Sequence, residues 1–367
     1  MKKVIINGAN GYVASHFTKK LLSQNYEVIA LVRDNKKASS TNRMIDTLSE
    51  IDDYNDANYS NLKVYSYSLL EENFSIPTEQ LEEIYSGNPD FFHFAACLKF
   101  AAKDKDEIFE TNVDGVENSI KVFLKYATPA SRFFFVGTVY SCGNMAGLFE
   151  EKFYEDDDIT AFRNYYEQSK RFAENIVKKH IEQNNLNGYI IRLSQVVGNN
   201  KSGVTITDYG VFDFVKRICG FCNKYPDETV RISIDPESTQ NLISINNVVN
   251  CMMKVLTEHE LPLIINFAGR NPIKNDNIIK HICKLLPIDI IQNKTLETAN
   301  LNIKERIIAV GMTFTGGYTS TNILFDSKNI DAITGTSENE ITEQSLYKMM
   351  EYFIDKLQNK KLSDMPN

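Results

Sequence analysis

The sequence contains no hydrophobic run close to the roughly 20 residues that span a bilayer, and its amino terminus leads directly into a strand-like segment instead of a signal peptide. We therefore expect no membrane span and a cytoplasmic location. Positive charge is also in deficit, because 40 Lys and Arg face 48 Asp and Glu, which gives a net charge of -8. This balance disfavours nonspecific binding to nucleic acid or to anionic membranes.

Metal-ligand motifs are missing as well. The five histidines form no HExxH or other spaced ligand set. The six cysteines are scattered, as expected for reduced thiols. Cys219 and Cys222 form one CxxC pair, but no second pair accompanies it and it follows an apolar helical run, which disfavours a redox or metal role. The sequence therefore predicts no metal site.

Strands and helices alternate over the first two thirds of the chain. Short apolar runs, typical of buried strands, occur at 3–7, 26–32, 62–67, 90–96, 132–136 and 189–193, with helical patterns at 77–87 and 106–127. Residues 46–60 are acidic and turn-rich, which indicates an exposed excursion. The alternation predicts an α/β fold with a doubly wound, mainly parallel sheet of the Rossmann type. Beyond residue 198 it loosens, and the last hundred residues read as short strands and two helices.

A glycine turn joins the first predicted strand to a helix. A strand, a tight turn and a helix together point backbone N–H groups at a pyrophosphate. Glycines permit the turn and a close approach of the ligand, and a small residue lets the helix pack on the strand. A plain strand-to-helix turn is the alternative. The predicted pyrophosphate contacts are Gly8, Asn10, Gly11, Tyr12, Val13 and Ala14.

The second predicted strand ends at Arg33 and Asp34. At this position an acid accepts the ribose 2′-hydroxyl of NAD, whereas an arginine suits the 2′-phosphate of NADP. Arg33 occupies the strand end and Arg43 adds a second charge, so NADP is favoured, although Asp34 keeps NAD open. Ala95 and Ala96, at the end of the fourth strand, are small enough for a nucleotide to pass close to the backbone.

Tyr166 and Lys170 lie four residues apart in a helical pattern over 162–180, and so share one helix face. A neighbouring ammonium lowers the pKa of a phenol from about 10, and the phenol then exchanges a proton with a substrate oxygen. Thr138 follows the fifth predicted strand, at the edge where open α/β sheets bind ligands. The alternatives are a buried ring beside a solvated lysine, and a strand-end cap.

These residues together resemble the extended short-chain dehydrogenase/reductases. GANGYVA is similar to the family's cofactor turn, Asn112 to its helix asparagine, Thr138 to its Ser/Thr, and Tyr166 with Lys170 to its YxxxK. Within that family, HFAACLKF, ETNVDGVENS, NYYEQSKRFAENIV and STNILFDSKNI are similar to the fatty acyl-CoA reductases and the carrier-protein thioester reductases.

The resemblance implies an NADP-binding Rossmann domain over 1–198, to which 239–268 returns, and a smaller mixed α/β substrate-binding lobe over 199–238 and 269–367. It implies that Thr138 and Tyr166 polarise a carbonyl, that Asn112 supports a proton relay, and that Lys170 also binds the nicotinamide ribose. Ser68 and Leu69 stand near the adenine, where Ser68 replaces the family's usual acid. We expect residues 144–165 to form part of a substrate lid.

The implied activity is an NADPH-dependent reduction of an acyl thioester, or of the derived aldehyde, with Tyr166 as proton donor. The thioester would arrive as a CoA ester or on a separate carrier protein. A ketone or aldehyde reductase, and a nucleotide-sugar epimerase or dehydratase, use the same catalytic residues and stay open. A nonenzymatic dinucleotide sensor is disfavoured, because it has no need of Thr138, Tyr166 and Lys170.

Overall fold

The computed structural model describes residues 2–311, 315–318, 322–335 and 340–363. Its centre is a seven-stranded sheet in which every neighbouring pair is parallel. The strand order is β12-β7-β5-β4-β1-β2-β3. The bounds are Lys3–Asn7 for β1, Glu27–Val32 for β2, Leu62–Ser66 for β3, Asp90–His93 for β4, Phe133–Thr138 for β5, Gly188–Leu193 for β7 and Ile264–Phe267 for β12.

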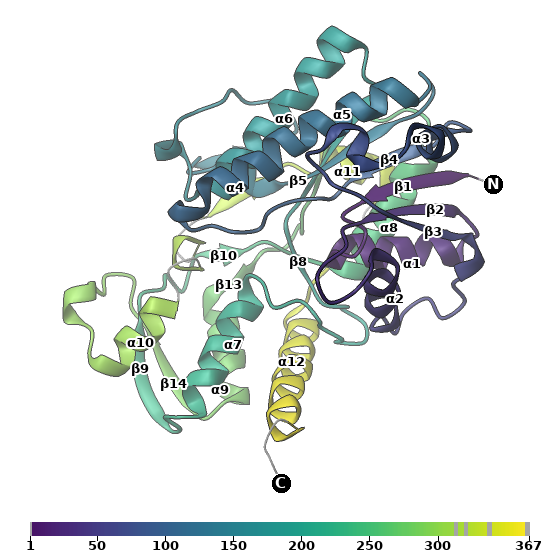
Figure 1. The fold of residues 1–367 in the computed structure, drawn as a ribbon. Helices are drawn as coiled ribbons and strands as arrows, with labels where there is room; N and C mark the ends of the chain where they lie inside the picture. The colour runs from purple at the N-terminus through teal and green to yellow at the C-terminus, as the bar shows by residue number, and fades with distance from the viewer. Residues whose placement is uncertain (1, 312–314, 319–321, 336–339, 364–367) are drawn as a thin grey trace.

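Helices cover both faces of this sheet, as the continuous apolar strands require (Figure 1). Side chains alternate between the faces: Val4 and Ile6 pack on one side and Ile5 on the other. The first face carries α1 (Tyr12–Ser23), α2 (Ser40–Ser49), α8 (Ile245–Thr257) and α11 (Lys328–Thr334). The second carries α3 (Thr78–Tyr85), α5 (Gly115–Tyr126) and α6 (Tyr165–Asn184). The predicted Rossmann-type fold is confirmed.

A second hydrophobic core belongs to a smaller lobe beside the carboxyl ends of the strands (Figure 1). Its helices are α7 (Val211–Cys222), α9 (Asn275–Leu285), α10 (Ile303–Gly311) and α12 (Glu343–Ser363), and its strands β9 (Glu228–Ile232) and β14 (Ile288–Gln292) pair in parallel. Cys219 and Cys222 are buried within this core. Three short pairs complete the fold: β8 (Gln195–Val197) with β11 (Leu242–Ser244), β10 (Thr239–Gln240) with β13 (Ile273–Lys274), and β6 (Gly147–Phe149) with β15 (Ile323–Phe325).

Several sequence expectations need correction. The start of the 46–60 segment is not an open excursion, because α2 runs through Ser49, and Leu48 and Ile51 are buried against the sheet. Strand β5 extends to Thr138, two residues beyond the predicted end. The predicted helix over 106–127 is divided into α4 (Lys105–Phe109), a π-helical turn (Glu110–Asp114) and α5.

The carboxyl-terminal part also differs from expectation. Beyond residue 268 the described residues form four helices, α9 to α12, where two were predicted. One of them, α11, packs on β12 and α8 and places Ile330 in the core of the large sheet, although 269–367 was assigned to the lobe. In the part of the chain that the structure describes, no helix combines the length and apolar character needed to cross a membrane. The same residues hold no cluster of three or more His, Cys, Asp or Glu suited to a metal ion.

Candidate active site

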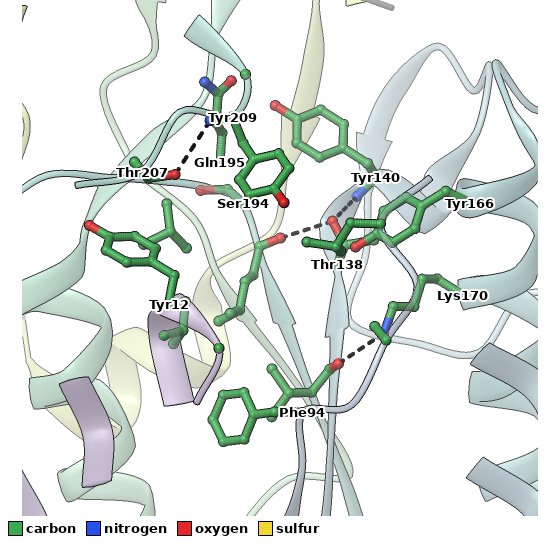
Figure 2. A pocket seen from close by; sticks show the side chains of 18 of the residues that line it. Tyr12, Phe94, Thr138, Tyr140, Tyr166, Lys170, Ser194, Gln195, Thr207 and Tyr209 are labelled. Atoms are coloured by element: carbon green, nitrogen blue, oxygen red, sulfur yellow. Dashed lines mark hydrogen bonds between the residues drawn. The ribbon is translucent and has the colours of Figure 1, made fainter. Parts of the chain in front are cut away.

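A cavity of about 560 Å³ lies between the carboxyl edge of the large sheet and the lobe. The β1–α1 turn, the ends of β4, β5 and β7, and the first turns of α6 form its sheet-side wall. Residues of the 194–214 segment and of α9 line the opposite wall. In Figure 2, Thr138, Tyr166 and Lys170 project from one side, and Tyr209 projects toward them from the other.

The β1–α1 turn has the geometry of a dinucleotide turn. Gly8 adopts φ +61°, and a Cβ there would lie 2.9 Å from the backbone nitrogen of Ala95. Its carbonyl accepts a hydrogen bond from the N–H of Gly11, 2.9 Å away, and Gly11 precedes α1 without a side-chain cap. The first-turn amides of α1 therefore face the cavity with the positive end of the helix dipole, which suits a pyrophosphate.

Arg33 and Asp34, which follow β2, face different surroundings. The Asp34 carboxylate accepts the Ser40 N–H at 2.5 Å and the Ser66 hydroxyl at 2.6 Å, and these hydrogen bonds lower its pKa. Asp34 is thus engaged with the start of α2 and the end of β3. Arg33 and Arg43 line the cavity instead, with Arg43 donating to the Arg33 carbonyl. This wall therefore presents positive charge, which suits a 2′-phosphate.

Thr138 and Lys170 are held by the backbone of neighbouring strands. The Thr138 hydroxyl donates to the Leu193 carbonyl at 3.1 Å and accepts the Tyr140 N–H at 3.2 Å. Lys170 donates to the Val136 carbonyl at 3.4 Å (Figure 2). Tyr166 is the second residue of α6, and the Lys170 ammonium lies 6.0 Å from the centre of its ring. One wall of the cavity thus carries two hydroxyls and an amine.

Burial is the main cause of the pKa shifts of Tyr166 and Lys170. It lowers the pKa of Lys170 to about 8, against an opposing effect of Glu174. Burial also raises the pKa of Tyr166, and the neighbouring Glu167 raises it further. This direction is opposite to the lowering expected from Lys170, because desolvation penalises the phenolate more than an ammonium 6.0 Å from the ring centre stabilises it. Tyr166 therefore holds its proton firmly, as a donor must before the reaction.

Two predicted site residues do not line the cavity. Asn112 is buried in the π-helical turn, where its Oδ1 accepts the Cys97 N–H at 2.7 Å and its Nδ2 donates to the Cys97 carbonyl and to the Ser169 hydroxyl at 3.1 and 2.9 Å. It therefore ties the loop after β4 to α6. Ser68 lies in the loop after β3, where its backbone N–H donates to the Phe74 carbonyl. Leu69 does line the cavity, together with Tyr67.

The cavity gathers the other predicted site residues, although their sequence positions are far apart: Gly8, Asn10, Gly11, Tyr12, Val13, Ala14, Arg33, Arg43, Leu69, Ala95, Ala96, Thr138, Tyr166 and Lys170. No residue of the fully described 144–165 segment lines it, so that segment is not the expected lid. Much of this segment packs on α6 and β15 instead.

Sequence reasoning missed the lobe-side residues of the cavity. These are Gln195, Thr207, Tyr209, Val211, Phe214, Ile234, Gln240, Ile278, Ile279 and Tyr318. They come from loops, from the short strands β8 and β10, and from helices whose apolar faces also build the lobe core, so no spacing pattern marks them. The one residue that could have pointed to this wall is Gly210. Its backbone has φ +58°, and a Cβ there would lie 2.1 Å from the Gln195 amide nitrogen.

The family follows from a match of residues 6–252, more than half of the chain, to the NAD-binding family model described as Male sterility protein. The chain belongs to this family. With its seven-stranded parallel sheet, it belongs to the extended short-chain dehydrogenase/reductase class of NAD(P)-binding oxidoreductases.

Curated relatives are distant reductases. The chain is 25% identical over 202 residues to dihydroflavonol 4-reductase of Gerbera hybrida, covering 53% of this chain and 51% of the relative. It is 25% identical over 204 residues to cinnamoyl-CoA reductase CAD2 of Medicago truncatula, covering 53% and 58%. Identity to the L-2-aminoadipate reductase large subunit of Eremothecium gossypii is 24% over 258 residues, covering 64% of this chain and 18% of the relative. The chain spans about half the length of the first two relatives.

Solved structures share the fold over nearly the whole chain. The terminal R domain of the myxalamid PKS-NRPS pathway superposes with a TM-score of 0.76 at 14% identity, covering 100% of this chain and 93% of the other. A thiolation-reductase di-domain of an archaeal non-ribosomal peptide synthetase gives 0.74 at 18%, covering 98% and 76%. UDP-glucuronic acid 4-epimerase of Bacillus cereus, in complex with NAD, gives 0.65 at 16%, covering 97% of each chain. At these identities the likeness concerns the fold.

Proposed function

We propose that this protein is an NADPH-dependent reductase that transfers hydride to the carbonyl of an acyl thioester, or of the aldehyde derived from it. The observation that carries the proposal is one continuous cavity. It runs from a glycine turn and two arginines, past the Tyr166 and Thr138 hydroxyls, to a wall of uncharged residues in the lobe.

The cofactor assignment rests on the residues of the sheet-side wall. Residues 1–198, with 239–268, would hold the dinucleotide, with its pyrophosphate at the start of α1. Arg33 and Arg43 would bind a 2′-phosphate, since both line the cavity while the Asp34 carboxylate is occupied by Ser40 and Ser66. Lys170 would bind the nicotinamide ribose. Bound NADPH would supply the hydride.

The catalytic roles follow from the two hydroxyls. Tyr166 would donate its proton to the substrate carbonyl oxygen as negative charge develops there. Thr138 would turn its hydroxyl proton from the Leu193 carbonyl to the same oxygen. Lys170, with a pKa of about 8, keeps its positive charge near neutral pH and favours that negative charge. Asn112 would act at a distance, by holding the loop after β4 against α6.

The lobe-side wall favours an acyl substrate over a nucleotide sugar. Among the described residues, the charged side chains that line the cavity are Arg33, Arg43 and Lys170, all on the sheet side. Val211, Phe214, Ile234, Ile278 and Ile279 give the lobe side an apolar surface. The diphosphate of a nucleotide sugar is bound best by cationic side chains, which are not among the described residues of this wall, whereas an alkyl or aryl chain gains about 25 cal/mol per Å² of apolar surface that it buries. CoA or a separate carrier protein would deliver the chain as a thioester, in keeping with the thiolation-reductase relative.

The test follows NADPH and NADH oxidation with acyl-CoAs, a carrier-bound acyl thioester, free aldehydes and ketones. With UDP-sugars it follows product formation instead, because an epimerase or dehydratase returns its cofactor to the starting redox state. We expect turnover of thioesters or aldehydes with a preference for NADPH. Turnover of a UDP-sugar alone would favour the epimerase or dehydratase reading, and turnover of ketones alone a simple ketone reductase. Tyr166→Phe should abolish most activity, and Tyr85→Phe, which removes a phenol hydroxyl from the core outside the cavity, serves as its matched control.

A further inference from the structure

The amino-terminal end of α6, which carries Tyr166, is built around a buried carboxylate. Asn164 caps the helix by accepting the Glu167 N–H at 3.0 Å, and Glu167 is fully buried. The Glu167 carboxylate reaches back to accept the Arg163 N–H at 3.1 Å. The Arg163 guanidinium binds both carboxylate oxygens at 3.1 and 3.2 Å. Tyr166, the proposed proton donor, therefore lies between the capping residue Asn164 and the buried carboxylate of Glu167.

A residue from more than 150 positions further along the chain completes this end of the helix. The Tyr318 hydroxyl donates to Glu167 at 2.5 Å and accepts from the Asn164 amide at 3.0 Å. Its ring lies 5.0 Å from the Arg163 guanidinium and meets the Tyr140 ring edge-on at 5.2 Å. One phenol thus contacts the cap, the carboxylate and the cation that together fix the first turn of α6.

Tyr318 is also a cavity residue and is tied to the lobe side. Its backbone carbonyl accepts the Gln240 amide at 2.9 Å, and Gln240 donates as well to Asn275, the first residue of α9. Gln240, Asn275 and Tyr318 all line the cavity. A chain of hydrogen bonds therefore runs from α9 through Gln240 and Tyr318 to Glu167, next to the proposed proton donor.

We infer that Tyr318 is a positioning residue, which holds the first turn of α6 through Glu167 and so aligns Tyr166 with the substrate carbonyl. A buried carboxylate that loses one of its hydrogen-bond donors pulls its remaining partners toward itself, because unsatisfied buried charge is costly. Glu167 is adjacent to Tyr166 in the same helical turn, so any shift of its backbone moves the phenol. The inference rests on the proposed role of Tyr166, but part of its test does not.

The first variant is Tyr318→Phe, which keeps the ring contacts with Tyr140 and Arg163 and removes only the hydroxyl. Small misplacement of a reacting group costs about 10- to 100-fold in rate, so we expect kcat to fall by that factor. The dissociation constant for NADPH, measured by fluorescence, should stay unchanged, because the glycine turn and the two arginines are untouched. Tyr85→Phe, in the core outside the cavity, should leave both quantities unchanged.

The second variant, Glu167→Gln, keeps the size of the side chain and removes its charge. If both variants act through the one hydrogen bond, the double variant should be no slower than the slower single variant, since coupled residues are not additive. Multiplied losses in the double variant would overturn the inference, and so would a Tyr318→Phe enzyme with wild-type kcat.

Amide hydrogen exchange gives a readout that needs no substrate. In Tyr318→Phe, the peptide covering 164–170 should exchange faster than in the wild type, while β5 and α1 keep their protection. Unchanged exchange at 164–170 would overturn the inference whatever the enzyme reduces. Faster exchange together with a fully active Tyr166→Phe enzyme would instead reject the proton-donor role and leave the helix contact standing.

Discussion

Replacing Gly8 by alanine tests the geometry of the dinucleotide turn. The backbone of Gly8 is left-handed at φ +61°, and a Cβ would lie 2.9 Å from the nitrogen and 3.0 Å from the Cα of Ala95. The left-handed conformation costs an L-residue roughly 1–2 kcal/mol, and forcing a methyl group into packed backbone adds about 1–3 kcal/mol. We therefore expect Gly8→Ala to lower the free energy of unfolding by about 2–5 kcal/mol.

Gly87→Ala separates the two contributions. Gly87 has φ +81°, and a Cβ there would meet no atom within 4 Å, so only the conformational cost applies. In urea unfolding curves, Gly8→Ala should be less stable than Gly87→Ala by about 1–3 kcal/mol, the cost of the clash. NADPH binding should weaken in Gly8→Ala alone, because only that turn opens onto the cavity. Equal stabilities and equal NADPH affinities in the two variants would refute the close approach of Gly8 to the Ala95 backbone.

Three further predictions concern charge. Arg33→Ala or Arg43→Ala should weaken NADPH binding about 10- to 100-fold, the equivalent of a charge-assisted hydrogen bond, and leave NADH binding unchanged in parallel titrations. With the pKa of Lys170 at about 8, kcat/KM should fall above that pH as the ammonium is lost, and Lys170→Arg should move this alkaline limb upward. Burial raises the pKa of Glu151 from 4.5 to about 7, so its contribution to stability is fully present below pH 4.5 and is lost as the pH rises through 7. In unfolding curves of Glu151→Gln, this residue should contribute no fall in the free energy of unfolding over that pH range.

The sequence predicted the sheet and the turn well, because both depend on local spacing. Uninterrupted apolar runs such as Phe91 and Phe92 in β4 are what a strand buried on both faces requires. Gly8 was singled out for its backbone freedom, and its φ of +61° is one that side chains rarely adopt. The four-residue spacing of Tyr166 and Lys170 needs only a helix to bring both to one wall of the cavity.

Other features could not be read from spacing. Asn112 was grouped with the catalytic residues by resemblance, but the π-helical turn directs it to Cys97 and Ser169. The pKa of Tyr166 was expected to fall because Lys170 is near, but desolvation by the assembled cavity has the larger effect. Burial is a property of the whole fold, so the direction of that shift could not be judged from two residues.

The sequence by itself determined the family, the order of the strands along the chain and the residues of the glycine turn, because each is encoded in short-range pattern. Only the tertiary structure decided what faces the reacting group. In the folded chain, residues 144–165 lie outside the cavity, the lobe-side residues that line it are uncharged, and the Tyr318 hydroxyl donates to Glu167. Contacts between residues more than a hundred positions apart depend on the path of the whole chain, and no local spacing specifies that path.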